Sequence, residues 1–206
     1  LFTIALVYMS ISPVHAANVN TVKAAIVKHS IEMGVDPAIA LSIAKTESGF
    51  RHEARSSHGA VGVFQLMPST ARRMGLNPYS LDDNIKGGIM YYKSMYKMFG
   101  SMELALAAYN AGPGNVKKYR AVPPFSETRR FVAKITADYR QYKAHPDPAM
   151  IAASKAPTSI KGSVIAQTPS KAAVPMVKIE QARTLNVQML KETPIEVEVK
   201  SQSVAI

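Results

Sequence analysis

The chain has 206 residues, no cysteine and a formal net charge of +11. This length suffices for one well-packed domain with an extension, and the lack of cysteine excludes disulfides, thiol nucleophiles and cysteine-ligated metals. The positive charge suits nucleic acid, an anionic membrane or an acidic polymer, but a basic composition alone does not choose among them.

The first predicted element is a signal peptide. Residues 1–11 are apolar, and Val14 and Ala16 have the small-residue spacing that precedes a signal-peptidase cut. The run is too short to span a membrane, which takes about 20 residues. Because no Lys or Arg precedes the run, a buried N-terminal helix is the alternative. We predict that residues 1–16 are removed and that the mature protein is periplasmic or exported, without a transmembrane anchor.

Residues 17–143 are predicted to form one helical domain. Asp36 and Pro37 are typical of an N-cap and a first helical residue, and residues 37–46 are apolar on most sides, which indicates a buried central helix. No convincing strand pair appears, so the predicted class is mainly α. Four further helices are predicted. The first runs from Pro68 to Gly75, and the second begins at a cap on Asp82 or Asp83 and ends at Gly100. The third is capped by Ser101 and ends at Gly112, and the last begins at Ser126 or Thr128.

The composition changes at Ala144. Prolines recur through residues 144–206, and Ala, Ser, Thr and Lys dominate. This composition predicts a disordered, flexible C-terminal tail. Residues 195–199, Ile-Glu-Val-Glu-Val, alternate as a strand does, but no partner strand is evident.

Glu47 is the strongest candidate for chemistry. It closes the apolar helix, so its carboxyl is expected at the rim of the core, where desolvation raises a carboxyl pKa. A protonated carboxylic acid is what cleavage of a glycosidic bond first needs. The alternative is an ordinary surface glutamate, although a negative charge is poorly placed at a helix C-terminus.

A two-carboxylate hydrolase would need a second acid about 5–10 Å from the first. The sequence does not favour any one residue as this second acid. The spacing of the histidines and glycines gives no metal site and no phosphate loop, and no serine has the flanks of a nucleophile elbow. The basic residues are scattered, so nucleic acid is not an expected partner. The candidates for a second acid are Glu53, Asp82, Asp83 and Glu127.

Four motifs stand in a set order. They are Glu47-Ser48, the segment from Gly62 through Gln65 to Met67-Pro68, the segment from Ala108 to Gly112, and Glu127-Thr128. Each is weak alone, but the ordered set resembles the catalytic domain of the soluble lytic transglycosylases over residues 22–142. The resemblance implies a lysozyme-like helical domain of the goose-type lysozyme and lytic transglycosylase group, with no metal and no cofactor.

The resemblance also implies roles for individual residues. Glu47 matches the catalytic acid, which later serves as the base. Ser56 falls at the loop serine that orients the reacting sugar. Gln65 and Met67 match residues that line the cleft near the acid.

The remaining matches come from the second half of the domain. Tyr109 and Asn110 match the pair that positions the acid and the N-acetyl group of the substrate, and Glu127 matches a further cleft residue. The family usually has tyrosine where Phe131 stands, so the ring is kept and the hydroxyl is lost.

The implied activity is cleavage of the β-1,4 bond between N-acetylmuramic acid and N-acetylglucosamine in peptidoglycan, leaving 1,6-anhydromuramic ends. Peptidoglycan strands are the expected partner, a secretion, conjugation or pilus apparatus is a further one, and a monomer is expected. The alternatives are a hydrolytic muramidase of the goose-lysozyme type, a non-catalytic wall-binding assembly module, and a binder of anionic surfaces whose binding fails at high salt.

Overall fold

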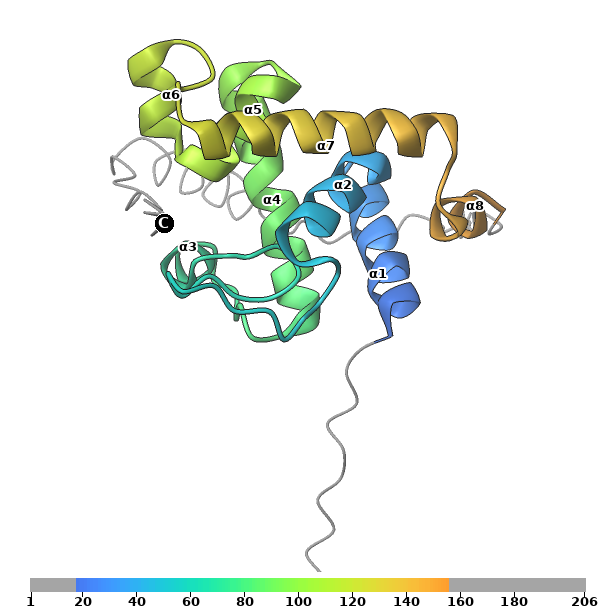
Figure 1. Cartoon of the computed structure of the whole chain (residues 1–206). Coiled ribbons are helices and arrows are strands. Elements are labelled where there is room, and N and C mark those ends of the chain that lie inside the picture. The colour runs from blue at the N-terminus through green and yellow to red at the C-terminus, as the bar shows by residue number, and fades with distance from the viewer. Residues whose placement is uncertain (1–17, 156–206) are drawn as a thin grey trace, which may run out of the picture.

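A computed structural model describes residues 18–155, which fold into a bundle of helices without extended strands (Figure 1). The predicted mainly α class is therefore confirmed. The predicted signal peptide and the alternating segment at 195–199 lie outside the described residues. The helices are α1 (Val19–Glu32), α2 (Pro37–Ser48), α3 (Pro68–Arg73), α4 (Leu81–Phe99), α5 (Met102–Ala111), α6 (Pro113–Tyr119), α7 (Ser126–Ala144) and α8 (Pro148–Lys155).

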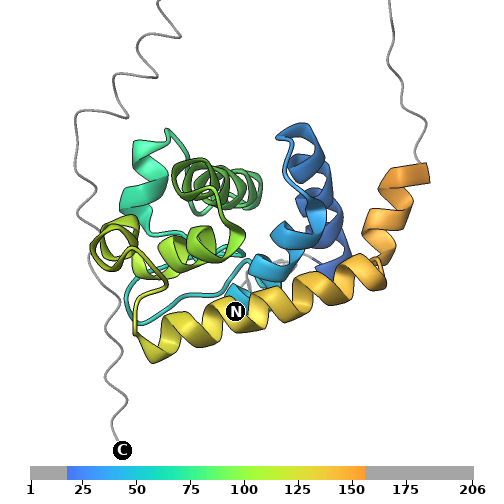
Figure 2. The same ribbon diagram turned by 90° about the horizontal axis from the view of Figure 1, so that it is seen from above.

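Helix α2 is the centre of the domain. Its residues from Ala38 to Ala44 are all buried, as its apolar sequence predicts. The Oδ1 of Asp36 accepts a hydrogen bond from the backbone N–H of Ala38 at 2.9 Å, which confirms the predicted cap. Figure 2 shows α7 along one edge of the domain, with α1 and α2 beside its C-terminal half and α5 and α6 beside its N-terminal half.

The cap predicted for α4 is wrong. Ser80, and not Asp82 or Asp83, is the N-cap, because its hydroxyl accepts from the backbone N–H of Asp83 at 3.4 Å. Asp82 instead contacts the buried ring of His29 at 2.6 Å and so ties α4 to α1. Sequence could not separate three polar residues in one turn, because any of them can cap a helix.

Described helical structure continues past the boundary predicted at Ala144. Helix α8 begins at Pro148, and Asp147 accepts from the backbone N–H of Ala149 at 3.0 Å. The other carboxylate oxygen of Asp147 accepts from Lys23 Nζ at 2.8 Å, which anchors α8 to α1. The Asp-Pro pair here is the same helix-start signal as at α2. Within residues 18–155 no helix combines the length and the apolar character that a membrane crossing requires.

Candidate active site

Glu47 lies on the last turn of α2, next to the final residue Ser48. Gly49 follows in a left-handed conformation with φ +62°, which lets the chain turn sharply away from the buried helix. Glu47 itself is half-buried, whereas Ala44 and Ser48 are buried. The carboxyl group therefore stands at the edge of the core, between the packed helices and the loop that follows.

Tyr109, on α5, lies near Glu47. Its hydroxyl donates to the carbonyl oxygen of Phe64 at 2.9 Å. Burial raises the pKa of this phenol well above its usual value, and the charge of nearby Glu47 and the ring of Tyr91 raise it further. The rings of Tyr91 and Phe131 pack against it, with centroids 5.1 and 6.3 Å away. Tyr109 is thus rigidly held and neutral, with its proton donated to Phe64 and its hydroxyl oxygen close to the Glu47 carboxyl group.

Ser48 fastens the loop to the end of α2. Its hydroxyl donates to the carbonyl oxygen of Val63 at 2.8 Å and accepts from the backbone N–H of Arg51 at 3.1 Å. The side chain directly after Glu47 therefore holds both the start of the loop and its returning segment at Val63. This role was not predicted, although the serine stands in the motif that identified the site.

Asn84 of α4 holds the same loop from the other side. Its Nδ2 donates to the carbonyl oxygens of Val61 at 2.9 Å and Pro78 at 3.0 Å, and its Oδ1 accepts from the N–H of Phe64 at 2.9 Å. Gly62 has φ +78°, and a Cβ there would come within 2.4 Å of Asn84 Nδ2. Sequence analysis missed Asn84. The only signal was a polar side chain within the apolar stripe of a helix.

Gln65 is also part of the loop structure. Its backbone is left-handed, with φ +45°, a conformation that costs a non-glycine residue roughly 1–2 kcal/mol. Its Nε2 donates to the carbonyl oxygens of Gly62 at 2.8 Å and Ala54 at 3.3 Å. Met67 is half-buried at the N-cap position of α3. Gln65 and Met67, the two residues predicted to line the cleft, therefore come directly after the segment that the Asn84 side chain holds.

The predicted loop serine has a local partner. Ser56 is half-buried, and its hydroxyl accepts from the backbone N–H of Ala60 at 3.0 Å. The backbone N–H of Ser56 in turn donates to the carbonyl of Ala60 at 2.9 Å. Ser56 therefore closes the tip of the loop.

Thr128 links Asn110 to the start of α7. The hydroxyl of buried Thr128 donates to Asn110 Oδ1 at 2.7 Å, which joins the end of α5 to the first turn of α7. Because its oxygen accepts this bond, the amide group of Asn110 can donate only through its nitrogen. Glu127, the neighbour of Thr128, is half-buried.

The other candidates for a second acid have structural partners or lie in solvent. Asp82 is paired with His29 and Lys86, and Asp83 accepts from the backbone N–H of Asn77 at 3.0 Å. Glu53 is exposed on the loop. In the part of the chain that the structure describes, no three His, Asp or Glu side chains gather as metal ligands. Of the predicted site residues, the structure places Tyr109 near Glu47, and Glu47 and Glu127 remain as half-buried acids.

Replacement of Tyr109 by phenylalanine tests this arrangement. The variant leaves the buried carbonyl of Phe64 without its donor, which costs about 1–3 kcal/mol, and removes a hydroxyl beside Glu47. We expect a lower melting temperature and an at least tenfold loss of the glycan cleavage that the sequence resemblance implies. Denaturation and a turbidity assay on cell walls measure the two effects. Unchanged activity together with unchanged stability would contradict the geometry.

Comparison with known proteins identifies the family of the helical domain. The family model described as "Transglycosylase SLT domain" matches residues 24–132, just over half of the chain. The soluble lytic murein transglycosylase of Salmonella typhimurium is 34% identical over 137 residues, which cover 54% of this chain and 21% of that protein. The corresponding Escherichia coli K12 protein is 31% identical over 148 residues, covering 59% of this chain and 23% of that protein. The chain thus spans less than a quarter of these relatives.

Solved structures show the same fold. An inactive glutamate-to-glutamine mutant of the lytic transglycosylase Slt from Pseudomonas aeruginosa superposes with a TM-score of 0.54 at 31% identity, over 62% of this chain and 25% of that one. The 70-kDa soluble lytic transglycosylase from Escherichia coli gives 0.53 at 28% identity, again over 62% and 25%. The predicted lysozyme-like helical fold is therefore confirmed.

Proposed function

The chain belongs to the transglycosylase SLT domain family, and from this premise we propose that it cleaves the glycan strands of peptidoglycan as a lytic transglycosylase. The observation that carries the proposal is that half-buried Glu47 lies near the neutral, buried hydroxyl of Tyr109. The relatives, whose names describe them as murein transglycosylases, support the substrate class.

In the first proposed step, Glu47 is the general acid. Its proton passes to the oxygen that links C1 of N-acetylmuramic acid to N-acetylglucosamine, and the C1–O bond breaks. Asn110, whose amide oxygen is held by Thr128, is suited to donate from its nitrogen to the N-acetyl carbonyl of the sugar.

In the second step Glu47, now ionised, is the general base. It takes the proton of the C6 hydroxyl of the same muramic acid, whose oxygen bonds to C1 and closes a 1,6-anhydro ring. No water is consumed, and the carboxyl regains its proton. Because the nucleophile is part of the substrate, one carboxylate suffices, which fits the structural partners found for Asp82 and Asp83.

Product analysis distinguishes this function from its alternatives. Purified peptidoglycan is digested with the protein, and the released muropeptides are analysed by mass spectrometry. We expect anhydromuramic ends, lighter by one water than reducing ends. Reducing ends would identify a muramidase instead, and an undigested sacculus that still binds the protein would identify a wall-binding module.

The cellular role is a further proposal. We infer that the protein acts in the periplasm after removal of residues 1–16, because its proposed substrate lies there. Local opening of the wall for a secretion, conjugation or pilus apparatus is consistent with this activity. N-terminal sequencing of the mature protein tests the cut after Ala16, and capture of apparatus proteins by cross-linking in cells tests the role.

A further inference from the structure

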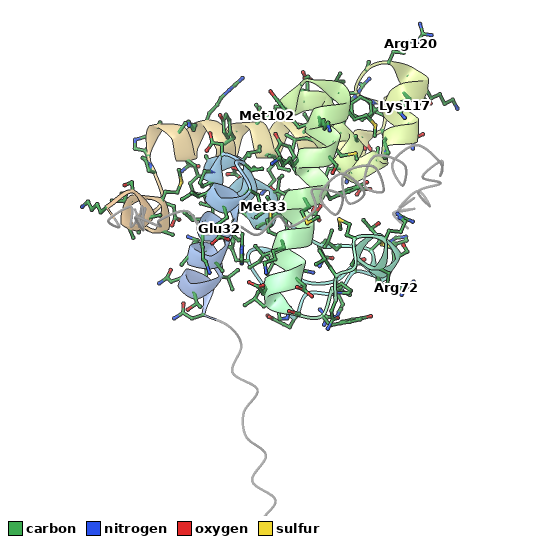
Figure 3. All side chains as sticks on the ribbon, turned by 180° about the vertical axis from the view of Figure 1, so that it is seen from behind. Glu32, Met33, Arg72, Met102, Lys117 and Arg120 are labelled. Carbon is green, nitrogen blue, oxygen red and sulfur yellow. The ribbon has the colours of Figure 1, made fainter. Side chains whose placement is uncertain are left out.

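A second concave surface lies apart from Glu47. It is a groove of about 540 Å³ between the turn that joins α1 to α2, the C-terminal half of α4, the start of α5 and α7. None of the predicted site residues lines it. Its apolar lining includes Val35, Ile39 and Met102. Figure 3 shows Met33 and Met102 on one side of α4 and Arg72 on the other. We refer to this surface as the α4 groove.

Aromatic rings form much of the α4 groove. Tyr92 is buried, and Tyr96 packs near it with a centroid distance of 6.2 Å but is 48% exposed. The hydroxyl of Tyr139 donates to Asp36 Oδ2 at 3.3 Å, which holds the third ring in place. A preformed groove with an uncovered aromatic ring is typical of a surface that receives an apolar segment.

The charge of the α4 groove is positive. Asp36, its only acidic residue, already accepts from the backbone N–H of Ala38 and from Lys143 Nζ, each at 2.9 Å. Lys93 and Lys97 also line the groove and are exposed. Lys93 donates to the carbonyl oxygen of Met33, which does not neutralise its charge. The groove therefore suits a segment that is both apolar and acidic.

We propose that residues 195–199 of the same chain bind in the α4 groove. When this Ile-Glu-Val-Glu-Val segment is extended, its three apolar side chains share one face and Glu196 and Glu198 share the other. Alternate residues of a strand are about 6.6 Å apart. Lys93 and Lys97 are one helical turn apart, about 6 Å. The two acids therefore match the two lysines in spacing as well as in charge.

No other part of residues 156–206 has this pattern. The acidic residues there are Glu180, Glu192, Glu196 and Glu198, and only the last two alternate with apolar residues. The connection is also long enough. Even at random-coil dimensions, the approximately 40 residues after Lys155 span roughly 35 Å, which is comparable to the width of the domain. The C-terminal segment can thus reach the groove of its own chain.

Disulfide trapping in the full chain tests the proposal, because the protein has no cysteine of its own. The groove pair is Met102→Cys with Val197→Cys, and the matched control is Arg72→Cys with Val197→Cys. Arg72 is exposed on α3, and both pairs have the same tail length. Under mild oxidation we expect the groove pair to form an intramolecular disulfide at least tenfold faster, after correction for the reactivity of each single thiol with a small disulfide reagent.

Charge reversal provides the second arm. Lys93→Glu with Lys97→Glu in the groove pair is expected to lower the rate to that of the control, and adding Glu196→Lys with Glu198→Lys is expected to restore it. If Met102→Cys lowers the melting temperature, Tyr96→Cys replaces it, because that ring is half exposed. Equal rates for both pairs, a disulfide between two copies, or a rate indifferent to charge reversal would overturn the proposal.

Discussion

Glu47→Gln is expected to abolish glycan cleavage while leaving the fold intact. Glutamine has nearly the same shape but has no proton to give and cannot accept one as a base. General acid or base catalysis typically contributes about 10²–10⁴-fold, and Glu47 is proposed to act in both steps. We therefore expect a loss of at least about 10³-fold. The melting temperature should change little, because the side chain is only half-buried at the end of α2. The measurement is muropeptide release from purified peptidoglycan.

Glu53→Gln is the matched control for this variant. It makes the same chemical change six residues further on, at an exposed loop position. Because Glu53 is exposed on the loop, we expect the activity of this variant to stay within about twofold of that of the original protein, as surface changes generally have small effects. Comparable losses in both variants would show that net charge, and not the acid at position 47, governs cleavage.

Gly88→Ala is expected to have the largest effect on stability. Gly88 lies on α4 where Phe64 packs against the helix, and a Cβ there would come 2.1 Å from the Cγ of the Phe64 ring. Phe64 is fully buried, so its ring has little room to move. Overpacking of a core costs typically 1–3 kcal/mol, and this contact places the variant at about 3 kcal/mol or more. Chemical denaturation measures the loss.

The same substitution should also reduce activity. Displacement of Phe64 moves the carbonyl oxygen that accepts from Tyr109, and with it the hydroxyl close to Glu47. Gly114→Ala in α6 is the control, because a Cβ there meets nothing within 4 Å. Alanine favours a helix over glycine by roughly 0.5–1 kcal/mol, so the control should be as stable as the original or slightly more. Equal stability of the two variants would contradict the packing described for Phe64.

The start or end of a helix could be predicted from sequence where a residue type has a single structural role at that position. The Asp36-Pro37 pair predicted the start of α2, and the structure confirms its capping bond. The same pair at Asp147-Pro148 starts α8, although the prolines around it predict a flexible extension. Helix α6 was also missed, since Pro113 and Gly114 indicate a turn as readily as a first helical turn.

Sequence alone determined the helical class, the place of Glu47 at the end of a buried helix, and the ordered motifs that identify the family. These depend on neighbours within a few turns and on the order of segments along the chain. Only the tertiary structure decided which groups hold the site together: Tyr109 on Phe64, Asn84 on the loop, and Thr128 on Asn110. The partners in these bonds are 18 to 45 residues apart, and helix packing brings them together. No local periodicity or spacing in the sequence indicates such a long-range hydrogen bond.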